Sequence, residues 1–429
     1  MLFLAFFLLL FLRTVAAPFE TAQAGTYHLT GTIAEMPDTG KTRVTVELRN
    51  VTLDGCSIRS RVSVSVPLCE LYYGDTLELD ATLKPAERPL TAAYTHVIAT
   101  GRSKTVPTLL AHHDDLYGAL LRLRASLGNA LDVMYRDQAH NARSMFLGDR
   151  SRMPYELTER YANNGILHIF AVSGMHMTVL ISLAGSIIRI RNRWLHLLSI
   201  LLVSAFYCAL TAFTPSVLRA MFFLIGLQIA NIRDRQPDPP SAYCFSVAAI
   251  LLLRPYSLYT AGFLLSFGAM AGMILLVQPF TNLLHLPQNR WSGTLIGAMA
   301  AMIGIIPLQA YLFTEVPWTS IPMSLALVPV LPILMPFGFF SMFLYPFFPH
   351  IATGISLPPY GAFVLIDRLT SWLNAAPISV SKPPIASIVL YGIGLVLCSQ
   401  LYLPARRRPP YEGFCSVAAS ILLWILFGA

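Results

Sequence analysis

Residues 215–232 read PSVLRAMFFLIGLQIANI, an apolar run in which Arg219 is the only charged side chain. About 20 predominantly apolar residues are enough for a helix to cross the hydrocarbon core of a bilayer. Prolines interrupt residues 320–376, where we expect two crossings, over 320–335 and 337–348, and an interfacial helix over 357–374. Further spans are expected near 166–189, 194–213, 241–255, 257–280, 292–313, 385–403 and 411–428. The sequence thus predicts about ten spans.

The composition of the chain agrees with a polytopic α-helical membrane protein. Of its 429 residues, 55% are hydrophobic and 12% are charged, and the mean hydropathy is +0.59. Soluble domains carry about 25% charged residues, so a water-soluble fold of this length could not cover so much apolar surface. The net charge of +8 is weak evidence for nucleic acid, because cytoplasmic loops of membrane proteins are enriched in Lys and Arg.

The N-terminal part of the chain differs from the rest. Residues 1–24 contain the apolar run LFLAFFLLLFL and predict an uncleaved membrane anchor, with a cleaved signal peptide as the alternative. Residues 25–105 alternate apolar and polar side chains with a period of two, which is typical of strands. Five strands are expected, near 26–35, 43–52, 58–66, 75–84 and 94–101. Five short strands favour a small OB-like β-barrel, and a β-sandwich is the alternative.

Two further parts follow the β domain. Residues 109–147 carry leucines at helical spacing, so residues 106–153 predict an amphipathic helix on the membrane surface and a linker. Residues 154–429 form the polytopic membrane part. If the β domain is extracytoplasmic, the basic loops fall on the cytoplasmic side, in agreement with the positive-inside rule. These loops contain Arg189, Arg191, Arg193, Arg233, Arg235, Arg290 and Arg406–Arg408.

Polar residues cluster in the stretch LGDRSRMPYELTERYANNGILHIFAVSGMHMTVL, residues 147–180. Polar groups at bilayer depth are costly, and they tend to face a bundle interior or a water-filled path. His168 and His176 lie eight positions apart, which on one helix is roughly 12 Å along the axis. That distance is too long for one ion. We therefore expect no metal site and no cofactor, and the alternative to a path is two histidines satisfied by neighbouring helices.

This stretch resembles the signature of the ComEC competence family of DNA-uptake membrane proteins. The family pattern G-D … G-x-x-H … S-G-x-H is occupied by Gly148, Asp149, Gly165, His168, Ser173, Gly174 and His176. PSVLRA, residues 215–220, is similar to the family's P-S-x-x-R-A. GFLLSF, residues 262–267, is similar to G-F-Q-L-S-F, with Leu264 where Gln is common. The resemblance covers about residues 25–320 and includes an OB-like domain after an anchor.

The resemblance implies a channel that moves single-stranded DNA across the cytoplasmic membrane in natural transformation. It implies an extracytoplasmic DNA receptor as a partner, besides membrane lipid. There is no G-x-x-x-x-G-K-[ST] motif, so energy is expected from a cytosolic ATPase. Many family members end in a metallo-β-lactamase-like domain, but no H-x-H-x-D-H occurs here. We therefore expect a transporter rather than an enzyme, with a separate nuclease. The expected path residues are His168, Ser173, Gly174, His176, Ser216, Arg219 and Ser266.

Arg219 lies near the start of its expected span. One interpretation is that it extends to the outer surface. The other is that its cation lines the channel and meets phosphate, with Glu315 as a possible ion-pair partner.

The β domain gives weaker signals. It has nine basic and nine acidic residues and is formally neutral. Arg43, Arg49, Arg59 and Arg61 are candidate DNA-binding residues, and solvated faces are the alternative. Cys56 and Cys69 flank the third strand, and in an exported domain they are candidates for a disulfide.

Two other functions are compatible with the sequence. A membrane-embedded hydrolase or transferase would use Ser173 and His176, which share a helix face at positions i and i+3, as nucleophile and base. A non-catalytic receptor or scaffold would use the β domain for binding and the helices as an anchor. The costly polar motif argues against the second of these.

Overall fold

The computed structural model describes residues 24–35, 37–39, 42–58, 60–69, 71–85, 97–112, 115–187, 192–285, 290–373 and 376–399, and also residues 417, 420, 421 and 424. The expected N-terminal anchor lies outside these residues except for its last position, and the expected span 411–428 does so except for four positions. Arg59 is also outside them. The chain divides into two compact units, Met1–Ser126 with Ala248–Thr260, and Leu127–Val247 with Ala261–Ala429.

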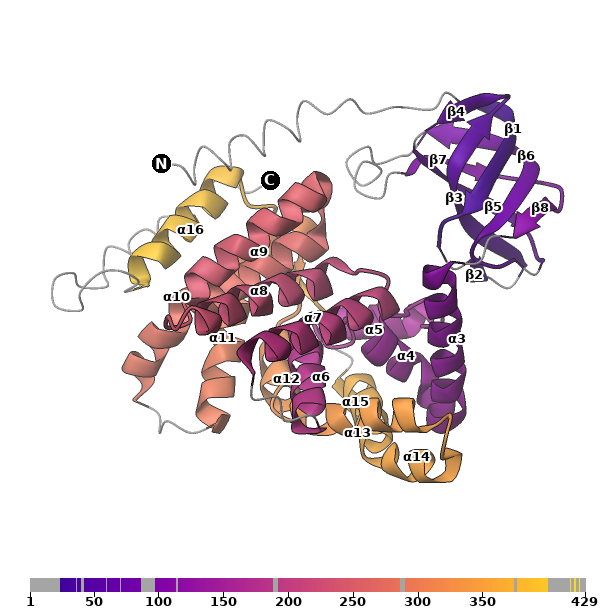
Figure 1. Cartoon of the computed structure of the whole chain (residues 1–429). Helices are drawn as coiled ribbons and strands as arrows, with labels where there is room; N and C mark the ends of the chain where they lie inside the picture. Colours follow the sequence, from indigo (N-terminus) through magenta and orange to yellow (C-terminus); the bar gives the residue numbers. More distant parts are fainter. Residues whose placement is uncertain are drawn as a thin grey trace. The chain divides into compact units, whose positions relative to one another are not determined.

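The first unit contains a closed five-stranded barrel (Figure 1). Its strands are β1 (Gly25–Ile33), β3 (Arg43–Leu53), β5 (Arg61–Pro67), β6 (Asp75–Pro85) and β7 (Val97–Arg102). The neighbours follow the order β1-β3-β5-β7-β6, and β6 pairs back with β1, which closes the ring. All pairs are antiparallel except β5 with β7. The expected strands and barrel are confirmed, and the sandwich alternative is wrong.

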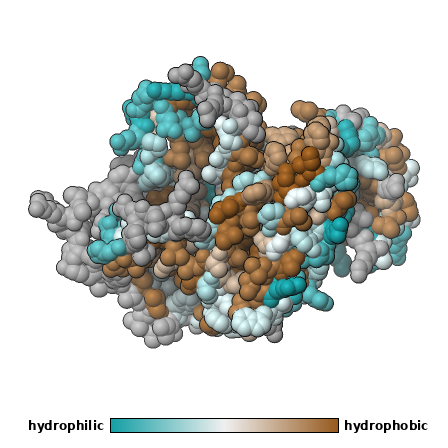
Figure 2. Space-filling model, turned by 90° about the horizontal axis from the view of Figure 1, so that it is seen from below, coloured by the Kyte–Doolittle hydropathy of each residue, from teal (hydrophilic) through white to brown (hydrophobic). Residues whose placement is uncertain are grey.

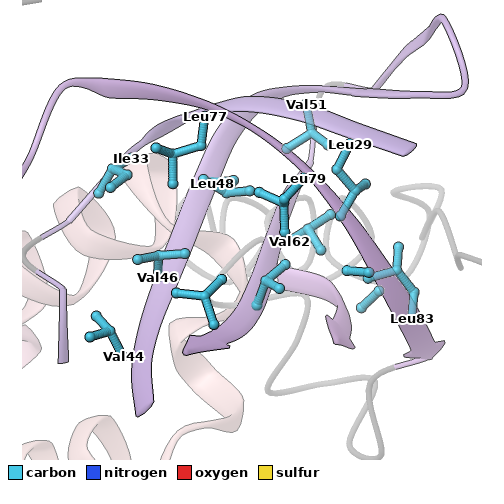
Figure 3. Close-up of a cluster of buried hydrophobic side chains, with 14 of the residues drawn as sticks. Leu29, Ile33, Val44, Val46, Leu48, Val51, Val62, Leu77, Leu79 and Leu83 are labelled. Carbon is cyan, nitrogen blue, oxygen red and sulfur yellow. The ribbon is translucent and has the colours of Figure 1, made fainter. Parts of the chain in front are cut away.

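The barrel interior is apolar because every second side chain of a strand points inward, and these inward side chains are the apolar ones. In β5, Val62, Val64 and Val66 are fully buried, while the residues between them are partly exposed. Figure 3 shows labelled interior side chains, such as Leu48, Val62 and Leu79, lying between the surrounding strands. Two short strands, β2 (Asp38–Thr39) and β4 (Cys56–Ile58), pair with β3 outside the ring. Alternation in the sequence therefore translates directly into a single core.

The prediction of one helix over 109–147 is wrong in two respects, because the helix starts later and is interrupted. Thr108–His112 form strand β8, which pairs with β6 and exposes every side chain. Helix α3 (Leu116–Tyr135) follows, and then a short 3-10 helix, η1 (Arg136–Gln138), precedes α4 (Ala139–Leu147). Arg136 has a φ of 45°, which is incompatible with a continuous right-handed helix. The side chains of α4 are buried from Asn141 to Leu147, so this segment is part of a core.

The remaining described elements of the chain are mainly helices. They are α5 (Tyr155–Asn163), α6 (Gly174–Ile187), α7 (Arg193–Leu210), α8 (Pro215–Ile232), α9 (Pro239–Leu253), α10 (Ala261–Leu284), α11 (Arg290–Phe313), α12 (Ser320–Leu327), α13 (Leu331–Leu344), α14 (Pro349–Ile355), α15 (Leu357–Leu373) and α16 (Ile385–Cys398), with the short elements η2 (Pro255–Tyr259), β9 (Glu315–Val316) and β10 (Ile378–Ser379). The end of α9 from Ala248 onward and the whole of η2 cluster with the first unit, and the other elements just named belong to the second unit.

Four described helices, α7, α8, α10 and α11, are long and apolar enough to cross a membrane. The pair α12–α13 passes the same test together, although it bends by 60°. Helices α6, α9 and α16 are apolar but shorter. Figure 2 shows large hydrophobic areas on the face of the molecule that it displays, as expected where helices face lipid. The count of about ten crossings stays a prediction.

Glycines allow α10 and α11 to approach closely. A Cβ atom built on Gly272 would lie 2.4 Å from the carbonyl oxygen of Ala300 and 2.9 Å from the Cα of Gly304. The same close approach recurs at Gly304, whose Cβ would lie 2.8 Å from the carbonyl oxygen of Gly268. Small residues at helix contacts are a common way to pack helices in lipid, where no hydrophobic force drives them together.

The expected span 166–189 begins later than the sequence suggested. Helix α6 starts at Gly174, and residues 164–173 are not helical, with turns at 164–165 and 167–170. Gly165 has a φ of 68°, which ends α5 in the way that a left-handed glycine commonly ends a helix. His168 and Ser173 therefore precede the helix, and the expectation that they lie on it is wrong.

Candidate functional site

Arg143 anchors the turn that carries Gly148 and Asp149. Its side chain is only 7% exposed, and its Nε and Nη2 donate to the two carboxylate oxygens of Asp132 at 2.6 Å each. Its Nη1 donates to Asp149 at 3.1 Å. Gly128 leaves room for the guanidinium, because a Cβ there would lie 2.6 Å from Nη1. The sequence did not predict this buried ion network, because the break at η1 lies between Asp132 on α3 and Arg143 on α4.

Two further contacts hold the turn that carries Gly148 and Asp149. Gly148 has a φ of 69°, and a Cβ on it would lie 3.2 Å from the side chain of Val172. Ser144 on α4 donates to the carbonyl oxygen of Phe170 at 2.8 Å. The G-D turn therefore packs directly on the residues that lead into α6.

Ser173 and His176 form the N-terminal cap of α6. Ser173 is the residue before the helix, and its backbone N–H donates to Nδ1 of His176 at 3.1 Å. The Ser173 hydroxyl lies 3.1 Å from the same nitrogen. A side chain at the third helical position that binds back to the cap N–H is the arrangement of a capping box, with histidine in place of glutamate. The S-G-x-H spacing thus has a local structural cause.

The cap fixes the tautomer of His176. A backbone N–H can only donate, so Nδ1 is the acceptor and the ring proton lies on Nε2. His176 is fully buried, and its Nε2 has no hydrogen-bond partner among the described residues. The ring therefore presents a buried N–H donor.

Helix α8 packs its first turns against this cap. The Ser216 hydroxyl donates to the carbonyl oxygen of Val172 at 2.5 Å. A Cβ on Gly174 would lie 3.5 Å from the Cβ of Ala220. The two motifs S-G-x-H and P-S-x-x-R-A, forty residues apart in the chain, are therefore in contact. The N-terminal ends of two helices meet at this point.

The turn that precedes α8 is strained. Ala212 and Phe213 have φ values of 55° and 53°, a region that costs non-glycine residues about 1–3 kcal/mol each. Hydrogen bonds hold the turn: the N–H of Phe213 donates to the carbonyl oxygen of Cys208 at 2.7 Å, and the Thr211 hydroxyl donates to that of Tyr207 at 2.9 Å. Strain of this kind is concentrated at functional sites.

Arg219 projects from the second turn of α8 and is 6% exposed. Its guanidinium carbon lies 5.5 Å from the ring centroid of Phe267 on α10, the last residue of GFLLSF. Its Nε and Nη1 atoms have no hydrogen-bond partner among the described residues. No ion pair joins it to Glu315, which is exposed on β9, or to another described carboxylate. Arg219 therefore does not extend to the surface.

The other two residues of the expected path are His168 and Ser266. The His168 ring is exposed and its Nδ1 lies 2.8 Å from the carbonyl oxygen of Gly165. Ser266 is half-buried on α10, next to Phe267. The structure thus brings together Ser173, Gly174, His176, Ser216 and Arg219.

An apolar hollow of the helical unit lies elsewhere. Its space of about 200 Å³ is partly open to solvent. Its lining consists of Met145, Phe146, Leu331, Leu334, Met335, Pro359, Ala362 and Phe363. No group of three metal-ligating side chains occurs among the described residues.

The barrel arginines are engaged within their own domain. Arg43 donates to the Ser65 hydroxyl at 3.0 Å and to two backbone carbonyls. Arg49 donates to the Tyr73 hydroxyl at 3.0 Å. Arg61 forms ion pairs with two glutamates, Glu35 and Glu47.

The cysteines of the barrel are free in the structure. Cys56 is exposed on β4 and Cys69 is half-buried after β5. The expected disulfide between them is not formed.

Comparisons with known proteins agree with the motif pattern. A family model described as "Competence protein" matches residues 145–405. ComE operon protein 3 of Bacillus subtilis (strain 168) is 26% identical over 263 residues, which cover 59% of this chain and 32% of that protein. The uncharacterized protein YcaI of Escherichia coli (strain K12) is 26% identical over 250 residues, covering 52% of this chain and 32% of that protein.

An uncharacterized protein of Aquifex aeolicus (strain VF5) is 28% identical over 217 residues, which cover 50% of this chain and 48% of that protein. The chain thus spans from about a third to about half of the length of these curated relatives. No solved structure matches. The family match covers more than half of the chain and includes all three motifs. The chain belongs to the competence protein family.

Proposed function

We propose that this protein takes part in DNA uptake during natural transformation, as a multi-pass protein of the cytoplasmic membrane that conducts single-stranded DNA. The observation that carries the proposal is Arg219, a buried cation with unpartnered N–H groups at the place where the family motifs meet. A polyanion that crosses an apolar bundle needs such groups along its path. Membership in the competence family supports the same function.

Within this proposal, Ser173, Gly174, His176, Ser216 and Arg219 form one section of the path. His168 and Ser266 belong to other sections. The β-barrel is extracytoplasmic, where it meets the DNA receptor. A cytosolic ATPase supplies the energy and a separate nuclease removes the other strand. The barrel arginines do not support strand binding, because Arg43, Arg49 and Arg61 are already bound to acceptors in the barrel.

The test is the entry of labelled DNA into the cytosol of a strain that lacks the gene. Complementation with the wild-type gene is expected to restore entry. Complementation with His176→Ala plus Arg219→Ala, at matched abundance in the membrane, is expected to fail. DNA entry that continues without the gene would exclude the proposed function.

A second candidate function is acyl or phosphoryl transfer with Ser173 as the nucleophile. The 3.1 Å contact between the Ser173 hydroxyl and Nδ1 of His176 favours it, because a nucleophile and its base must lie within hydrogen-bond reach. However, Nδ1 also accepts the N–H of Ser173, and no described carboxylate orients Nε2. Labelling of Ser173 by a serine-reactive phosphonate would support this candidate, and its absence would leave Ser173 as a cap.

A further inference from the structure

Arg219 is a buried cation that forms no ion pair with a carboxylate in the part of the chain that the structure describes. Burying a cation is costly unless hydrogen bonds and an opposite charge compensate for it. The face of the Phe267 ring supplies part of this compensation, and a cation–π contact leaves the N–H groups free. Two aromatic neighbours, Phe263 and Tyr243, pack on Phe267 with ring centroids at 4.3 and 5.5 Å. The guanidinium is therefore held in place, while Nε and Nη1 have no hydrogen-bond partner among the described residues.

The backbone around Arg219 favours negative charge. The free N–H groups at a helix N-terminus and the helix dipole both attract anions. Here two helices, α6 and α8, begin at the same place, since Gly174 packs on Ala220 and Ser216 binds the carbonyl of Val172. Long side chains on a helix lean toward its N-terminus, so Arg219 leans toward the start of α8. His176 adds a buried Nε2–H donor from the first turn of α6.

We propose that the first turns of α6 and α8, with Arg219 and His176, form a binding site for one phosphodiester group of the DNA strand. This inference rests on the proposed function and adds the chemical group that the site takes. The planar guanidinium fork of Arg219 matches the oxygens of a phosphate better than a single point charge does. The site recognises the backbone, so it is indifferent to base sequence.

The experiment measures binding of a fluorescent oligothymidylate to the full-length protein in phosphatidylcholine nanodiscs at several salt concentrations. Arg219→Gln is expected to weaken binding about 10- to 100-fold, as expected for the loss of hydrogen bonds to a charged group. It is also expected to reduce the slope of log K against log salt by about 0.7, which corresponds to one phosphate contact on a single strand. Arg233→Gln, at the exposed C-terminal end of the same helix, is the matched control and should leave the slope of this site unchanged.

Two further variants separate a binding role from a structural one. Arg219→Lys keeps the charge, so it should keep the salt slope while weakening binding. His176→Asn removes a neutral donor, so it should weaken binding without changing the slope. These two variants also decide the matter if Arg219→Gln fails to fold. A strand with methylphosphonate linkages, which lack the negative charge, should lose the difference between wild type and the Arg219 variants.

Several outcomes would overturn the inference. One is wild-type affinity and an unchanged salt slope for a folded Arg219→Gln protein. Another is equal binding of the methylphosphonate strand. A third is displacement of the strand by phosphatidylglycerol through Arg219, which would assign the site to a lipid head group. In each case, DNA entry that still depends on the gene would leave the proposed function standing. Failure of the phosphodiester site can therefore be distinguished from failure of the proposed function.

Discussion

Replacing Arg143 by methionine tests whether the buried ion network holds the G-D turn. The substitution keeps an unbranched apolar stem but removes three contacts with carboxylates, two to Asp132 at 2.6 Å and one to Asp149 at 3.1 Å. Removing one partner of a buried ion pair costs about 3–5 kcal/mol. We expect the lower end of this range, because the carboxylates of Asp132 and Asp149 are 29% and 21% exposed.

The chain contains a matched control for this prediction. Arg152 donates to the same residue, Asp132, at 2.8 Å, but its side chain is 60% exposed. An exposed ion pair contributes about 0–1 kcal/mol. Arg152→Met should therefore cost at least about 2 kcal/mol less than Arg143→Met, a difference of roughly 30-fold in the ratio of folded to unfolded protein.

The assay is equilibrium unfolding of the full-length protein in mixed micelles with a rising fraction of a denaturing detergent. Helicity and tyrosine–tryptophan fluorescence report the transition for wild type and both variants. Equal losses of stability in the two variants, or none in Arg143→Met, would refute the argument that burial makes this network important. Loss of DNA entry in Arg143→Met at normal abundance would show in addition that the turn serves function.

Two other predictions concern the helices and the barrel. Gly272→Ala should destabilise the α10–α11 pair by about 1–3 kcal/mol, because its Cβ would meet backbone at 2.4 Å, whereas Gly293→Ala in open space should not; thermal unfolding compares them. Hydrogen bonds to Asp80 and then to Glu78 raise the pKa of His28 above 6.5. A histidine with a raised pKa stabilises the fold fully at a pH below its unfolded value of 6.5, and this stabilisation is lost as the pH rises through the raised pKa. His28→Gln should therefore lower the melting temperature at about pH 6 but not at about pH 8.5.

The barrel could be predicted almost strand by strand, because its core depends on a local alternation of side chains. Strand β8 could not, since Leu109 and Leu110 are adjacent and both exposed. Its strand conformation depends on pairing with β6, about thirty residues away. The start of α6 was misplaced for a related reason. Residues 166–172 are apolar except for His168, and only the cap at Ser173 and His176 shows where the helix begins.

The candidate site was predictable in part. The motif residues could be named from sequence, and the contact between Gly174 and Ala220 brings two of the motifs together. The role of His176 as a cap depends on a rotamer that spacing does not reveal. The partners of Arg43, Arg49 and Arg61 lie between 14 and 60 residues away in the chain. Arginines that are close in the sequence therefore did not predict unpaired positive charge in the folded barrel.

The connectivity of the barrel also bears on the order in which the protein assembles. Strand β1 completes the ring only when it pairs with β6, from Gly25↔Leu83 to Thr32↔Thr76, and β5 must wait for the parallel strand β7. Such distant pairings make folding slow, whereas helical hairpins rely on contacts between neighbours and form quickly. At about 5–20 residues per second, several seconds of synthesis separate β1 from its last partner. Until then the edge of β1 that β6 later covers is open to other chains, including chaperones and proteases.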